Sequence, residues 1–151
     1  MEKTFYLIRD RLYETEYWII DFLPIQVPYK SRGQYFKVEQ YYLQHPQIDQ
    51  LYRRFVNILL KLNSYEDLEV QLQNCEWVHN PEPSVLEEEV HQIFEKKNVL
   101  TILDIFSDFM IEINGGDTYI TIYNPDEKII HLLKELAHSE GLFLWKPERR
   151  E

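Results

Sequence analysis

The chain has 151 residues, of which 44% are hydrophobic, and its formal net charge is −10. This length and apolar content suffice for one hydrophobic core, so we expect a single domain over residues 1–151 that needs no disulfide or metal. The negative charge argues against a nucleic-acid partner, because affinity for phosphate comes from Lys and Arg. No run of eighteen apolar residues occurs, so we expect no membrane-spanning helix.

The negative charge is concentrated in the second half of the chain. Residues 1–65 contain nine Lys or Arg and seven Asp or Glu, whereas residues 66–151 contain seven and nineteen. The negative charge of residues 66–151 would attract a basic protein electrostatically, although a role in solubility alone would also explain this charge.

Two features predict a cytoplasmic protein. Cys75 is the single cysteine, which excludes an internal disulfide and a thiolate metal cluster and is typical of a reducing compartment. The N-terminal residues interleave charged and apolar side chains and lack the small-residue cleavage site of a secretory signal.

The first elements in chain order are partly ambiguous. Residues 4–13 fit a helix, with a short strand at residues 5–8 as the alternative. Residues 17–23 form an apolar and aromatic run before a proline, which is typical of a buried strand. Residues 34–44 again fit a helix or a strand, and we favour a helix.

The longest clear helix begins at Pro46 and ends near residue 62, because its apolar residues recur at helical spacing. Residues 67–73 alternate apolar and polar side chains, as a half-exposed strand does. Prolines predict a loop at residues 77–83.

The next helix should begin at Ser84, with Glu87 as its capping-box partner, and end near Asn98. Residues 99–106 are apolar and favour a strand, with an extension of the helix as the alternative.

Residues 108–147 predict a hairpin, a helix and a strand. Gly115 and Gly116 favour a two-residue turn with positive φ, in which Ile113 pairs with Thr118. One face of this hairpin carries Phe109, Ile111, Ile113, Thr118, Ile120 and Ile122, and the other carries Asp108, Met110, Glu112, Tyr119, Thr121 and Tyr123.

The helix that follows the hairpin should begin at Asn124 as its N-cap, with Glu127 as the capping-box partner. Gly141 should end this helix, and residues 142–145 should form a short strand. The whole pattern predicts an α+β fold, in which a mostly antiparallel sheet has helices packed on one face and the chain ends in a ββαβ unit. The other face should be partly open to water or to a partner.

Few residues suggest chemistry. His131, Glu135 and His138 share one helix face at a spacing that zinc could use, but they lie opposite the apolar stripe and should be solvated. Asp21 is a charge within an apolar run, which we expect to pair with an arginine (Arg9, Arg11 or Arg32) or to lie at a strand end. We therefore predict no catalytic residues, no metal and no cofactor, and we favour a non-enzymatic role.

The candidate functional surface is the polar face of the hairpin. It gathers Asp104, Asp108, Glu112, Tyr119 and Tyr123, and tyrosine is frequent at binding hot spots. Paired carboxylates could also do acid–base chemistry, but a protein-binding face or a plain solvated face fits better. We expect the partner to be a basic protein, and one version is an immunity protein that neutralises a basic nuclease toxin.

Two alternatives stay open. The chain could be a small-molecule sensor or an enzyme, with a pocket between sheet and helices that involves Asp21, Tyr17 and the arginine-containing loop after them. It could also form a homodimer through the exposed sheet face or edge.

Overall fold

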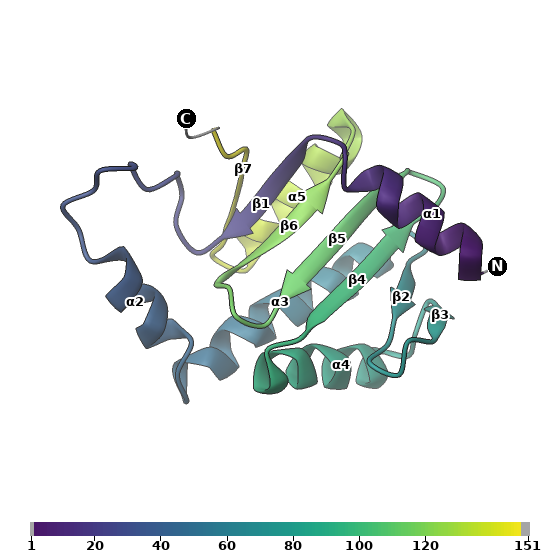
Figure 1. The fold of residues 1–151 in the computed structure, drawn as a ribbon, viewed down its shortest axis with the longest axis horizontal. Coiled ribbons are helices and arrows are strands. Elements are labelled where there is room, and N and C mark those ends of the chain that lie inside the picture. The colour runs from purple at the N-terminus through teal and green to yellow at the C-terminus, as the bar shows by residue number, and fades with distance from the viewer. Residues whose placement is uncertain (1, 149–151) are drawn as a thin grey trace.

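The computed structural model describes residues 2–148 and contains, within that range, five helices and one seven-stranded antiparallel sheet (Figure 1). The helices are α1 (Glu2–Leu12), α2 (Tyr35–Tyr42), α3 (Gln47–Asn63), α4 (Pro83–Lys96) and α5 (Glu127–Ser139). The strands are β1 (Tyr17–Asp21), β2 (Glu69–Gln71), β3 (Trp77–His79), β4 (Val99–Asp104), β5 (Phe109–Asn114), β6 (Tyr119–Tyr123) and β7 (Phe143–Trp145). Their order across the sheet is β3-β2-β4-β5-β6-β1-β7.

The predicted α+β fold is confirmed. Helices α3, α4 and α5 cover one face of the sheet, which we call the core face (Figure 1). Helix α1 crosses one end of the opposite face, which we call the second face. No helix within residues 2–148 has the length and apolar content that crossing a membrane requires.

Helix α3 is the centre of the core. Its buried side chains recur at helical spacing, as expected: Ile48, Leu51, Phe55, Val56, Ile58, Leu59 and Leu62. Phe55 stacks on Phe94 of α4, with ring centroids 6.0 Å apart and ring planes 16° from parallel. Aromatic pairs of this kind add to the stabilisation that area burial provides.

The hairpin of β5 and β6 keeps its predicted faces but not its predicted pairing. Ile113 pairs with Ile120 and not with Thr118, so the register is shifted by two residues. Because side chains alternate with period two, this shift leaves every side chain on the expected face. Ile111 and Ile122 accordingly point into the core.

The chain does turn at Gly115 and Gly116, but the predicted two-residue turn with positive φ is wrong, since neither glycine has a positive φ and residues 115–118 connect the two strands. Gly115 is required for a different reason: a Cβ built on it would lie 1.9 Å from the carbonyl oxygen of Ile93, near the end of α4. Its N–H donates to the carbonyl of Asn98 at 2.9 Å. The hairpin therefore packs directly on the backbone that ends α4.

The N-cap predicted for α5 is also wrong. The cap is Asp126, whose side chain accepts from the N–H of Ile129 at 2.8 Å, so Glu127 is the first helical residue. Asn124 instead adopts a φ of 62°, which asparagine tolerates better than most residues, and its side chain donates to the carbonyl of Asp108.

The capping box predicted at Ser84 does not form either. Helix α4 begins at Pro83, and its N-cap Glu82 makes no side-chain capping bond. Glu87 forms an ion pair with Arg53 of α3. The side chain expected to cap its own helix therefore ties two helices together.

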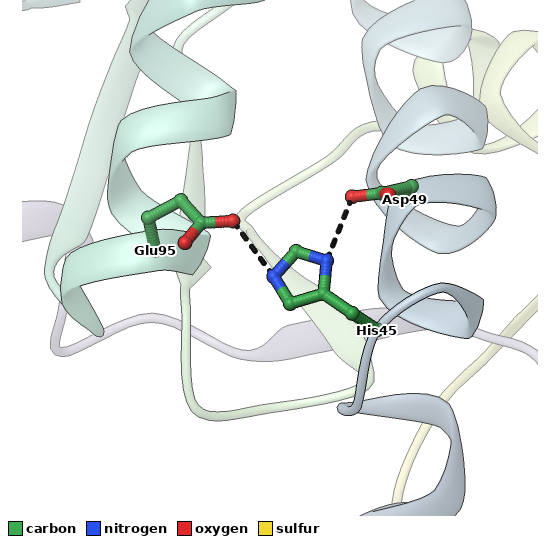
Figure 2. Close-up of side chains that lie close together, drawn as sticks. All are labelled: His45, Asp49 and Glu95. Carbon is green, nitrogen blue, oxygen red and sulfur yellow. Dashed lines mark ion pairs between the residues drawn. The ribbon is translucent and has the colours of Figure 1, made fainter.

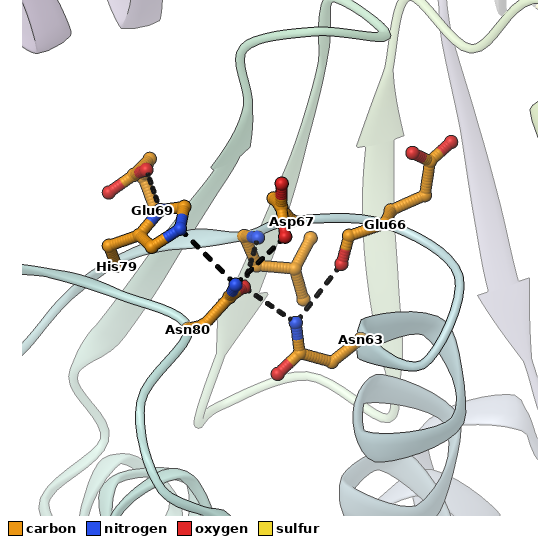
Figure 3. A network of polar contacts seen from close by, with 7 residues as sticks. Asn63, Glu66, Asp67, Glu69, His79 and Asn80 are labelled. Atoms are coloured by element: carbon orange, nitrogen blue, oxygen red, sulfur yellow. Dashed lines mark hydrogen bonds and ion pairs between the residues drawn. The ribbon is translucent and has the colours of Figure 1, made fainter.

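Residues 77–79 were expected in a loop but form the edge strand β3, in which Val78 pairs with Val70. The side chain of Asn80 holds the end of this strand in place by hydrogen bonds (Figure 3). Its side-chain oxygen accepts from the Asn63 amide at 2.8 Å and from the N–H of Leu68 at 2.9 Å, and its amide donates to Asp67 at 2.8 Å. The prolines that suggested a loop follow the strand instead of interrupting it.

We expect Asn80→Ala to lower the free energy of unfolding by about 2 kcal/mol, because it removes these bonds and leaves the half-buried N–H of Leu68 without its side-chain acceptor. Alanine also tolerates the φ of 45° at this position less well than asparagine. Urea denaturation measures the change. His79→Ala is the matched control, since its exposed ion pair with Glu69 should contribute much less. Equal losses from both variants would contradict this role of Asn80.

Candidate functional site

Helix α1 covers the part of the second face formed by β4 and β5. Leu12 packs on Leu103 and Met110 in a small second core, with Phe5 and Ile8 beside it. The face expected to be partly open is therefore divided. Helix α1 lies over one part, and within residues 2–148 no helix packs flat upon the part formed by β1, β6 and β7 (Figure 1).

The three acidic residues of the candidate surface have different surroundings. Asp104 is the last residue of β4 and is only 1% exposed. Asp108 is held by Arg11, and Glu112 accepts a hydrogen bond from the hydroxyl of Tyr13. Asp108 and Glu112 are therefore already bonded, to Arg11 of α1 and to Tyr13 just after it, and Asp104 is buried.

The two tyrosines of that candidate surface lie on β6. Tyr123 contacts the rings of Tyr13 and Tyr17, with centroids 5.3 Å and 5.8 Å away. Tyr119 pairs with Asp21 across the strands and lines a pocket. The structure therefore brings Glu112 near Tyr123, at the border of α1, but places Tyr119 in a separate site.

This pocket has a volume of about 730 Å³. Its floor is the uncovered part of the second face, and its walls are the loop at residues 22–34 and the first turn of α2. We call it the aromatic pocket, because its lining includes Tyr17, Tyr29, Tyr35, Phe36, Tyr119 and Trp145. It lies on the side of the sheet away from α3, α4 and α5.

Strand pairing builds the floor of the aromatic pocket. Alternate residues of β1 point into it, namely Tyr17, Ile19 and Asp21. Antiparallel pairing then sets Tyr119 of β6 opposite Asp21 and Trp145 of β7 opposite Ile19. Since cross-strand neighbours on one face lie within contact distance, three strands place an acid among aromatic rings.

The wall of the pocket is fastened to the C-terminal strand. The indole N–H of Trp145 donates to the carbonyl of Leu23 at 2.9 Å. The side-chain oxygen of Gln26 accepts from the N–H of Glu148 at 2.6 Å, and its amide donates to the carbonyl of the same residue. The loop is therefore held over the sheet by bonds to residues more than a hundred positions away.

Asp21 is the buried acid of the pocket, with 4% of its surface exposed. Its carboxylate accepts from the N–H of Phe22 at 2.8 Å, and burial raises its pKa to about 6. The expected pairing with Arg9, Arg11 or Arg32 is wrong, because no arginine is among the described groups that act on Asp21, and Arg9 pairs with Asp10 and Arg11 with Asp108. The alternative, a position at a strand end, is confirmed.

Other acids surround the same space. Glu39 accepts from the hydroxyl of Tyr35 at 3.1 Å, and its charge contributes to the raised pKa of both Asp21 and Asp117. Burial, assisted by Asp117 and Glu39, raises the pKa of Tyr119 to about 12. Among the lining residues in the described part of the chain there is no Lys, Arg or His. The pocket therefore has a negative potential without an internal counterion.

A second cluster lies where α3 begins and α4 ends (Figure 2). His45 points between two carboxylates, with Nδ1 3.4 Å from Asp49 and Nε2 3.0 Å from Glu95, and all three residues are exposed. Both ring nitrogens face a carboxylate, so His45 links Asp49 in the first turn of α3 to Glu95 near the end of α4. The i, i+4 spacing of His45 and Asp49 was the signal for it in the sequence.

The zinc-like spacing on α5 does not form a comparable cluster. His131, Glu135 and His138 are exposed, and the ring of His138 packs near Phe143 with centroids 5.9 Å apart. Their exposure agrees with the solvated face expected from the helical pattern.

Comparisons with known proteins give no relative: no family model, no curated protein and no solved structure matches this chain.

Proposed function

We propose that the chain is a non-catalytic binding domain for a basic protein, which it holds over the aromatic pocket. One observation carries the proposal: exposed aromatic side chains surround a pocket that contains a buried acid. Tyr29 is 73% and Phe36 is 76% exposed, and Tyr17 is also exposed. We call these three residues the aromatic rim.

Exposed aromatic residues around a concave site are typical of binding hot spots. They supply a large contact area at a low entropic cost, and a cluster of them on a surface marks an interaction site more strongly than scattered apolar residues do. Rim residues come from β1, from the loop after it and from α2, so they meet only because the chain folds back over the sheet.

Charge supports a basic partner over a neutral or acidic one. The chain carries a net charge of −10, and Asp21, Glu39 and Asp117 add negative potential at the pocket. A negative surface accelerates association with a positive one and disfavours wrong partners. An immunity-type inhibitor of a basic toxin in the cytoplasm remains a specific form of this proposal, supported by charge and size alone.

Fewer residues of the polar hairpin face expected to bind the partner remain candidates for the interface. Asp104 is buried, and Asp108 and Glu112 are already bonded to Arg11 and Tyr13. We therefore keep Tyr119 at the pocket and Tyr123 at the border of α1 as the members of that surface that a partner would contact. We place the centre of the interface at the aromatic rim.

A small-molecule sensor is the second candidate, favoured by the pocket volume of about 730 Å³, which falls within the range usual for ligand pockets. A thermal-shift screen with small cationic and neutral aromatic compounds tests it. Saturable stabilisation by a compound, together with no binding of basic peptides, would favour the sensor over the protein-binding domain.

Binding of defined peptides tests the main proposal. We expect basic peptides to bind the protein, binding to weaken with added salt, and Phe36→Ala to weaken it about tenfold, as the loss of a hot-spot aromatic does. Phe106→Ala is the matched control, because Phe106 is 94% exposed in the β4–β5 turn, outside the pocket. Fluorescence anisotropy gives the Kd values.

Three outcomes would count against this proposal. Acidic peptides could bind as well as basic ones, or Phe106→Ala could weaken binding as much as Phe36→Ala. Light scattering could also show a stable dimer that Phe36→Ala dissociates, in which case the aromatic rim would serve a second copy of the chain.

A further inference from the structure

Resting on the proposed function, we infer that the aromatic pocket takes one arginine side chain of the partner, whose guanidinium lies against Asp21 between aromatic rings. The chemical group that the pocket would bind is thus a guanidinium, whereas the aromatic rim alone indicates only that a partner binds there.

The need for a cation follows from the surroundings of Asp21. The hydrogen bonds to its buried carboxylate come from the backbone N–H groups of Phe22 and Leu23. Among the described residues, the charge that acts on Asp21 is the negative charge of Glu39 on α2, which raises the pKa of Asp21. A buried charge is costly unless a partner compensates it. A cation entering the pocket would supply that compensation at a site where the lining residues within 2–148 include no Lys, Arg or His.

The aromatic lining favours arginine among the possible cations. A guanidinium is planar, more weakly hydrated than an ammonium, and stacks on aromatic faces while its N–H groups bond to a carboxylate. Tyr119 lies beside Asp21 on the neighbouring strand. Trp145 has already used its N–H on Leu23, so the faces of its ring are what it offers to a ligand. The pocket volume of about 730 Å³ leaves space for the flanking backbone of the partner as well.

Proton linkage gives this site a recognisable signature. Burial raises the pKa of Asp21 to about 6, and a bound cation would favour the ionised carboxylate and lower that pKa. The other groups near it are Glu39 and Tyr35 on α2, Tyr119 on β6, Asp117 before it, and Glu148 after β7. Binding should therefore weaken as the pH falls below about 6, where Asp21 is protonated before the cation arrives.

The experiment uses blocked arginine (N-acetyl-arginine methylamide) as the probe, observed by NMR on the full chain. We expect it to shift the indole resonance of Trp145 and the amide resonances around Asp21. Blocked citrulline has the same shape without the charge and should not bind, and blocked lysine should bind more weakly. Asp21→Asn should weaken the binding of blocked arginine about tenfold or more, since it removes the charge of the pocket.

Glu135→Gln is the matched control, because it removes one exposed carboxylate on α5, on the other side of the sheet. Equal binding of citrulline, an unchanged Kd in Asp21→Asn, or binding that does not weaken from pH 7 to pH 5 would overturn the arginine site. The pH series needs only the unmodified chain, so it decides the question even if Asp21→Asn fails to fold.

The same measurements separate the two proposals. If basic peptides bind in a manner that depends on Phe36 while Asp21→Asn changes nothing, the binding domain stands and the arginine site is wrong. If blocked arginine binds at Asp21 but no basic peptide binds, the pocket recognises a small guanidinium compound and the proposed protein partner is wrong.

Discussion

Gly115→Ala should destabilise the protein by about 3 kcal/mol or more, because the new methyl group would overlap backbone that cannot move away. The Cβ would lie 1.9 Å from the carbonyl oxygen of Ile93, 2.7 Å from its carbonyl carbon and 3.1 Å from the Cα of Lys97. That carbonyl already accepts the N–H bonds that end α4, from Lys97 and from Asn98. Relief would require the hairpin to separate from α4, which would break the bond from Gly115 to Asn98.

Gly116→Ala provides the control within the same turn. Its nearest neighbour would be the side-chain oxygen of Asn114 at 3.4 Å, and its φ is not in the left-handed region. We expect a change of less than about 1 kcal/mol, as for a surface substitution. Urea denaturation of both variants makes the comparison. Similar losses would show that the turn needs glycine for its flexibility and not for the contact with α4.

The hairpin illustrates which parts of the fold the sequence predicts. Alternation of apolar and polar side chains predicted both faces correctly, because burial acts on each residue separately. The pairing of Ile113 depended on a local turn rule, and the turn was decided instead by the approach of α4, which no local pattern contains. The caps at Asn124 and Ser84 were wrong for a similar reason, since local capping rules do not specify which tertiary partner a side chain meets.

The second face shows the same limit for function. The pattern of residues 4–13 suggested a helix, but nothing in it indicated that α1 would lie on β4 and β5. Arg11 meets Asp108 across 97 positions of the chain, and this contact removes an acid from the candidate surface. The sequence identified Asp21 correctly as an unusual charge. The position of Asp21 beside Tyr119, in the same pocket as Trp145, depends on the order of the strands, which the sequence did not predict.

Asp104→Asn should stabilise the protein at pH 8, by between about 1 and 2 kcal/mol, which is the opposite of the usual effect of a buried substitution. One oxygen of Asp104 accepts from the N–H of Ser107 at 2.8 Å, and the other is buried without a hydrogen-bond partner. Burial, with smaller contributions from Glu66 and Asp67, raises its pKa from 3.8 to about 6. The folded protein at pH 8 therefore contains an ionised carboxylate in a buried position that disfavours its charge.

The sign of the pH dependence follows from the direction of this shift. A carboxyl group whose pKa is raised on folding holds its proton more tightly in the folded state, so its contribution is fully favourable below about pH 3.8 and is lost as the pH rises through about 6. The advantage of Asp104→Asn should accordingly be largest at pH 8 and close to zero at pH 4. Asp108→Asn is the control from the same turn, and it should slightly destabilise the protein because it removes the partner of Arg11. Urea denaturation of the unmodified protein, Asp104→Asn and Asp108→Asn at pH 4, 6 and 8 tests this prediction. If Asp104→Asn is destabilising at every pH, the carboxylate stabilises the β4–β5 turn as a hydrogen-bond acceptor by more than its burial costs, and the prediction is wrong.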